Sequence, residues 1–246
     1  MDSAALFILV TAVIFLSSFI RAFLGFGDAL VAMPILAVLI GIKSATPLVA
    51  FCSTTSAVTI LIKSWRKADI KATVRLVLST IAGIPFGLIF ITRVPEGYLK
   101  LVLGLILILY GLYSLNRPRF QLKKDSAPVS WVFGLTAGVL GGAYNTNGPP
   151  IVIYASLRRW PPEHFQATLQ SYFLPTGLLV LTGHGLAGLW TVRILRFYLV
   201  ALPLVLLAVY LGRKVHRSLK PGQFNTYVHA FLVGMGLLLI LRSGLL

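Results

Sequence analysis

The chain has 246 residues, of which 57% are hydrophobic and only 11% are charged, and its mean hydropathy is +0.89. A soluble globular domain carries about a quarter charged residues, so this composition excludes a water-soluble fold and indicates a protein embedded in a lipid bilayer. The net charge of +16 does not indicate a nucleic-acid partner, because the basic residues occupy short loops between apolar runs rather than one face.

Apolar runs cover most of the chain, and many approach the length of about 20 residues that a helix needs to cross a bilayer. The first run lacks the basic start and the cleavage site of a signal peptide, so we interpret it as a membrane helix. The runs predict an all-α, polytopic protein of the cell membrane. In chain order they are Ala4–Ile20, Ile35–Ile42, Thr46–Ile62, Leu76–Ile91, Leu99–Leu115, Phe165–Leu181, Ile194–Leu211 and Tyr227–Leu241.

The most polar stretch of the chain lies near its middle and separates two similar halves. The segments Gly25–Pro34 and Gly141–Pro150 match when one half is slid along the other by 116 residues. The match aligns a glycine at the start and a proline at the end of both segments, which favours an internal repeat. We predict one transmembrane domain, 1–246, with a first repeat at about 1–115, a linker at 116–130 and a second repeat at about 131–246.

The basic residues test this repeat independently, because cytoplasmic loops carry an excess of Lys and Arg. Four clusters, within 63–75, 117–124, 158–159 and 213–220, hold 15 of the 22 Lys and Arg residues. Placing all four on the cytoplasmic side makes the corresponding helices of the two halves run in opposite directions, which is an inverted-topology repeat. Each half then holds one broken, re-entrant helical hairpin and three transmembrane helices.

The two segments rich in glycine and proline predict breaks in the helices at membrane depth. Each would end one half-helix and start another, since proline suits the first turn of a helix. Irregular backbone in a membrane lines a cavity or packs inside protein, and helix N-termini present unpaired N–H groups that suit an anion. The alternative is that these residues only form tight turns and helix contacts. The candidate binding residues are Gly25, Gly27, Asn145, Thr146, Asn147 and Gly148.

Two charged residues, Arg21 and Asp28, flank the first predicted break. An arginine inside a membrane costs at least about 2.5 kcal/mol on insertion scales, so Arg21 needs a partner. It either contacts a bound anion or pairs with Asp28, seven residues further along the chain. Asp28 in turn either takes up a proton during a transport cycle or serves only that ion pair.

Neutral polar residues occupy two of the predicted membrane helices. Gln166 and Gln170 are four residues apart, so they share one helix face, which must point into the protein. They either bond a neighbouring helix or contact substrate. The hydroxyl residues at 53–56 are better explained by close helix packing.

The remaining chemistry-bearing residues have plain interpretations. We expect His184 at the membrane interface rather than in a catalytic role, and Cys52 as a buried thiol. Trp65, Trp160 and Trp190 adjoin loops, as interfacial aromatic anchors do. The single cysteine excludes a CxxC motif, and we expect neither a metal nor a cofactor.

The chain resembles the sulfite exporter TauE/SafE family, a group of membrane permeases for sulfur-containing and related organic anions. The resemblance lies in Gly25-Phe26-Gly27 through Pro34, and in Gly138–Pro150 (GVLGGAYNTNGPP) with Ile151–Tyr154 behind it. Paired halves and a basic central linker extend it to the whole chain. The GG-x₅-GPP element is the more specific motif, whereas Asp28 departs from the family's more glycine-rich first motif. The resemblance implies transport of a small anion.

We therefore expect a secondary transporter of the bacterial plasma membrane that moves a small anion of the sulfite, sulfonate or thiosulfate class. Two halves would rock about the breaks to give alternating access. No nucleotide-binding motif is present, so a coupling ion (proton or sodium) or the substrate's own gradient would drive transport. The alternatives are an anion channel of the same fold and a structural membrane component. A membrane enzyme is disfavoured, because HExxH, GxSxG and paired intramembrane aspartates are absent.

Overall fold

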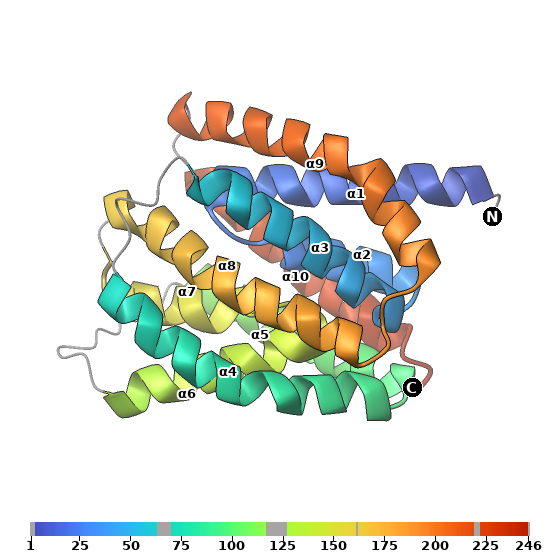
Figure 1. Cartoon of the computed structure of the whole chain (residues 1–246), viewed down its shortest axis with the longest axis horizontal. Helices are drawn as coiled ribbons and strands as arrows, with labels where there is room; N and C mark the ends of the chain where they lie inside the picture. The colour runs from blue at the N-terminus through green and yellow to red at the C-terminus, as the bar shows by residue number, and fades with distance from the viewer. Residues whose placement is uncertain (1–2, 63–69, 117–126, 161, 219–221, 246) are drawn as a thin grey trace.

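The structure is a computed structural model that describes residues 3–62, 70–116, 127–160, 162–218 and 222–245. Within these residues the chain forms ten helices and no strand, so the predicted all-α fold is confirmed. Trp65 and most of the predicted linker lie outside the described residues. The helices are α1 (Ser3–Leu24), α2 (Asp28–Leu39), α3 (Ile42–Leu61), α4 (Ile70–Arg93), α5 (Glu96–Asn116), α6 (Ala127–Tyr144), α7 (Gly148–Leu157), α8 (Pro162–Leu186), α9 (Val192–Ser218) and α10 (Gly222–Leu241) (Figure 1).

Five helices of the described chain, namely α1, α3, α4, α5 and α9, are long and apolar enough to cross a membrane. Large apolar side chains such as Phe86 and Leu109 point outward from them, as contact with lipid requires. The chain is therefore a multi-pass protein of the cell membrane. In contrast, α2 and α7 have only 12 and 10 residues. At 1.5 Å per residue they reach about 18 and 15 Å, half of a bilayer's hydrocarbon core.

The most extensive helix contacts join the first half of the chain, α1–α5, to the second half, α6–α10. α4 lies along α6 at the bottom of Figure 1, and α1 lies along α9 at its top. The fourth helix of each half thus packs on the first helix of the other half. Two clusters result, one of α1, α2, α3 and α9 and the other of α6, α7, α8 and α4, and they meet where α3 packs on α8.

Glycine allows the closest of these contacts, between α4 and α6. Gly83 and Gly87 on α4 face Gly138 and Gly142 on α6, and a Cβ added to any of the four would collide with the backbone of the other helix. Both pairs are spaced four residues apart, the pattern that lets helices in membranes approach closely. The backbones of α4 and α6 therefore lie closer together than any larger side chain at these positions would allow.

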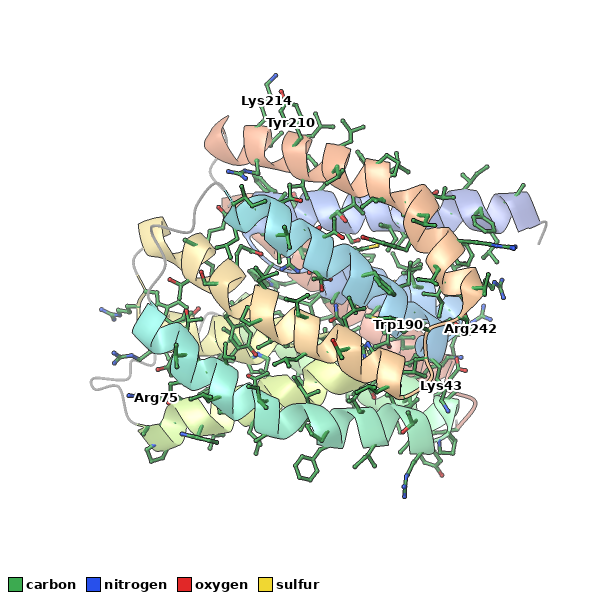
Figure 2. The ribbon with its side chains drawn as sticks, viewed as in Figure 1. Lys43, Arg75, Trp190, Tyr210, Lys214 and Arg242 are labelled. Atoms are coloured by element: carbon green, nitrogen blue, oxygen red, sulfur yellow. The ribbon has the colours of Figure 1, made fainter. Side chains whose placement is uncertain are left out.

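Charged residues at the helix ends separate as the loop charges predict. Figure 2 shows Arg75 and Lys214 at one end of the bundle, and Lys43 and Arg242 at the opposite end. The first broken hairpin enters from the right of Figure 1, where α1 and α3 begin, and the second enters from the left, where α6 and α8 begin. The orientation of the two halves in a membrane stays a prediction.

The structure corrects the extent and the register of the two breaks. Only 25–27 and 145–147 lie outside helices, so Pro34 is inside α2 and Gly141 inside α6. A Cβ added at Gly141 would lie 3.3 Å from Asn147 and 3.5 Å from Val180. The two breaks are 120 residues apart, not 116. The error of four residues is about one helical turn, which keeps the same helix face and hides the shift in sequence.

Candidate functional site

The first break places a buried ion pair at the start of α2. Gly25 and Gly27 have φ values of +91° and +100°, in the left-handed region that favours glycine. They reverse the chain so that α2 begins beside the end of α1. Nη1 of Arg21 donates to Oδ2 of Asp28 at 2.7 Å, and the two residues are 3% and 7% exposed. Of the two alternatives for Arg21, the structure shows the pairing with Asp28, and contact with an anion stays a prediction.

The Arg21 guanidinium has further partners on α8 but keeps one donor free. Nη2 donates to Oε1 of Gln170 at 2.9 Å, and Cζ lies 4.9 Å from the centre of the Phe173 ring. The latter is a cation–π contact. Nε of Arg21 is buried without a hydrogen-bond partner. A buried polar group without a partner costs about 1–3 kcal/mol.

The second break is neutral and is tied to the first through α3. Asn145 has a φ of +53°, a left-handed value that asparagine adopts more readily than most residues. Its Nδ2 donates to Oγ of Ser53 at 3.1 Å, and Oγ of Ser53 donates to Oδ2 of Asp28 at 2.6 Å. Nδ2 of Asn147 donates to Oγ1 of Thr176 at 3.3 Å. A continuous chain of hydrogen bonds therefore joins the two breaks.

A small cavity lies between the breaks, α3 and α8. Its volume of about 20 Å³ is room for about one water, so an oxyanion needs the surrounding helices to move apart. Oγ1 of Thr54, in the lining, is buried without a hydrogen-bond partner. The lining comprises Arg21, Gly27, Asp28, Ala29, Leu30, Ser53, Thr54, Asn145, Thr146, Asn147, Gly148, Pro149, Phe173 and Gly177.

The two helix N-termini at the cavity offer unequal numbers of donors. The first turn of α2 leaves the N–H groups of Asp28, Ala29 and Leu30 without acceptors in their own helix. α7 begins Gly-Pro-Pro, and because proline has no N–H, only Gly148 can donate from the same positions. The two helix N-termini therefore differ in the number of backbone N–H groups that they offer. The second break contributes mainly side chains.

Seven of the ten residues predicted for the site line the cavity, and the other three support it from outside. Nε2 of Gln170 donates to the Gly25 carbonyl at 2.6 Å, and Nε2 of Gln166 donates to the Ala22 carbonyl at 3.3 Å. Both glutamines thus face the interior, as their spacing predicts, and bond α1 and the first break to α8. Gln170 reaches the cavity only through Arg21. Which lining residues contact a substrate stays a prediction.

Sequence reasoning did not name seven of the 14 lining residues. Three of them, Ala29, Leu30 and Pro149, lie inside the two predicted break segments, and the other four lie on α3 and α8. Ser53 and Thr54 were interpreted as residues that allow close helix packing. The packing of α3 beside Asp28 would have identified them as lining residues, but the sequence does not show which helices pack together. Phe173 and Gly177 give no signal in an apolar run. His184 lies in the last turn of α8, near a helix end as expected, and is fully buried, with Nε2 2.9 Å from the Gly142 carbonyl. Within the described residues, no group of three His, Cys, Asp or Glu side chains could hold a metal ion.

Comparison with known proteins gives one family and one curated relative. The family model described as "Sulfite exporter TauE/SafE" matches residues 10–239. A protein of Cupriavidus necator named "Probable sulfite/organosulfonate exporter TauE" is 22% identical over 179 residues, which cover 73% of this chain and 69% of that protein. No solved structure matches the chain.

Proposed function

Because the chain belongs to the sulfite exporter TauE/SafE family of membrane transport proteins, we propose that it moves a small sulfur-containing or organic anion across the membrane. Sulfite, sulfonates and thiosulfate are the substrate class, in keeping with the name of the Cupriavidus relative. The observation that carries this proposal is the Arg21 guanidinium, which is buried beside the cavity and has an unpartnered Nε. A buried, fixed positive charge with a free donor is a site for an oxyanion.

The anion binds between the two breaks and takes the donors that lack partners. Nε of Arg21 and Oγ1 of Thr54 are buried and unpaired, and both residues line the cavity. The free N–H groups at the start of α2 add the positive end of a helix dipole. The amide of Asn147, held by Thr176, supplies a neutral donor from the second break.

Alternating access follows from motion of the two helix clusters rather than of the two sequence halves. The tight glycine contact favours joint motion of α4 and α6, and α1 packs on α9, where Gly212 lies against the backbone of α1. The cavity is lined by α3 and α8, at the junction of the clusters. Rocking at that junction opens the site to one side of the membrane and then to the other.

The test is counterflow of labelled anion in liposomes that contain the purified protein. Sulfite, thiosulfate, sulfate, small sulfonates and small carboxylates are compared, and a thermal unfolding assay with each anion identifies the ligand. We expect saturable exchange that is faster when the same anion is present on the opposite side. Absence of stabilisation and of exchange for every anion would overturn the proposal. Unsaturable current without counterflow would establish a channel instead.

A further inference from the structure

We propose that Asp28 carries one proton with each monovalent anion: the anion replaces the Asp28 carboxylate at Arg21, and Asp28 crosses the membrane protonated. The starting observation is that Arg21 is occupied by an internal anion in the closed site, at 2.7 Å. A substrate anion that takes Arg21 must displace that carboxylate. This inference rests on the proposed function, because it concerns the same cavity and the same arginine.

The charge balance of the cavity requires the proton. Arg21 and Asp28 are its two ionisable lining residues, and together they are neutral. A monovalent anion would leave the site with one unpaired negative charge beside a buried carboxylate, which is costly in low dielectric. Arginine stays protonated in proteins, so only Asp28 can restore neutrality, by taking a proton.

The geometry of the ion pair suits this exchange. Arg21 and Ser53 both bond Oδ2 of Asp28, and Oδ1 lies outside this pair of bonds. The Asp28 side chain is 10% exposed, at the cavity. A proton on the carboxyl group weakens its attraction for the guanidinium. Nη1 of Arg21 is then released to the anion, beside Nε, which already lacks a partner.

The other groups around Asp28 leave it as the proton carrier. Arg21 faces it from α1, and the Cys52 thiol lies within electrostatic reach on α3. α8 and the second break present neutral side chains to the cavity. Two further helices, α5 and α10, contact α2. Tyr110 of α5 and His229 of α10 contact each other through their rings. Glu96, at the start of α5, is half-exposed and paired with Lys100.

Binding of the anion at the first break also affects the second break. Ser53 donates to Asp28 and accepts from Asn145, so protonation of Asp28 changes the partner of a hydroxyl that holds the second break. The empty site and the site loaded with both proton and monovalent anion are neutral, whereas either ligand alone leaves a net charge. Only the two neutral states cross the membrane readily.

The proton comes from the solution on the side where the anion binds and returns to the solution on the other side. No bond other than the O–H bond of Asp28 forms or breaks. An acidic exterior then favours uptake of the anion, and export runs on an anion gradient that exceeds the pH gradient.

The decisive experiment measures proton uptake when anion binds to the purified protein in weakly buffered detergent solution. A pH indicator records the protons, and labelled anion identified by the screen above records binding. We expect about one proton taken up per anion bound, and an affinity that falls about tenfold per pH unit over the pH range in which that proton is taken up. Asp28→Asn should take up no proton and bind the anion with an affinity independent of pH, tighter than wild type at high pH. Glu96→Gln, outside the cavity, should behave as wild type.

The outcomes separate the two proposals. If wild-type protein binds no anion, the proposed function fails; if it binds anion without proton uptake, only this inference fails. Equal proton uptake by Asp28→Asn and wild type also overturns the inference. If Asp28→Asn does not fold, infrared difference spectra of wild type decide: anion binding must produce the C=O band of a protonated carboxylic acid. Its absence would overturn the role of Asp28.

Discussion

The two helix breaks have the same length, three residues each, but differ in backbone conformation and in chemistry. The first turns on two glycines with positive φ and carries the buried pair of Arg21 and Asp28. The second contains neutral amides, and α7 starts at the Gly-Pro-Pro sequence. Left-handed backbone therefore occurs in both breaks, whereas charged side chains occur at the first break alone within the cavity lining. In our account the first break binds the anion and the second positions neutral donors against it.

The largest expected effect is loss of the charged pair. Arg21→Gln combined with Asp28→Asn removes both charges, so no unpaired charge stays buried and the fold is retained. Anion affinity should fall by about 100-fold, since a buried charge contact contributes about 3 kcal/mol. Equilibrium binding of labelled anion measures it. Glu96→Gln with Lys100→Gln removes an ion pair outside the cavity and should leave affinity unchanged. Equal effects of the two double variants would remove Arg21 from the site.

The second effect concerns the backbone of the breaks. Gly27→Ala places a side chain at a φ of +100°, and should lower the free energy of unfolding by about 1–2 kcal/mol. A Cβ at Gly148 meets only ordinary contacts at 3.8 and 3.9 Å, so Gly148→Ala should change stability by less than about 0.5 kcal/mol. Unfolding in mixed detergent micelles compares them. Equal losses would show that the first break does not depend on its left-handed glycine.

A smaller effect separates the two neighbouring threonines of α3. Thr54 has an unpartnered hydroxyl in the cavity, whereas Oγ1 of Thr55 bonds the Phe51 carbonyl and Tyr198. Thr54→Val should weaken anion binding about fivefold, for one lost hydrogen bond of about 1 kcal/mol, without loss of stability. Thr55→Val should lower stability by about 1 kcal/mol and leave binding unchanged. Thermal unfolding with and without anion measures both, and the reverse pattern would place the anion elsewhere.

The smallest effect probes the start of α7. Pro149→Ala adds an N–H to a helix N-terminus that has few, and a helix end contributes about 0.3–1 kcal/mol to a nearby anion. Since Arg21 anchors the anion at the other break, we expect affinity to rise by no more than about threefold. A tenfold gain in labelled-anion binding would show that the second break is the principal anion site.

Sequence alone predicted the helix breaks and gave the Arg21–Asp28 pair as one of two alternatives, because glycine, proline and intramembrane charge have strong local consequences. The register of the repeat was wrong, since a shift of one helical turn preserves the apolar face. Ser53 and Thr54 were not assigned to the site, because their role depends on the packing of α3 against the second break. The residues of the Ser53–Asn145 hydrogen bond, for example, are 92 positions apart in the sequence. The exchange of helix partners, such as α4 with α6, is equally non-local.

The central claim is that the anion occupies the cavity between the breaks, held by Arg21. Selenite has the shape and charge of sulfite, and its selenium gives an anomalous X-ray signal. Crystals of the protein soaked in selenite should show one strong peak in the cavity, within hydrogen-bond distance of Nε of Arg21 and Oγ1 of Thr54. The peak should vanish in crystals of the Arg21→Gln and Asp28→Asn double variant. A peak elsewhere in the membrane region, or one that survives in the variant, would contradict the account.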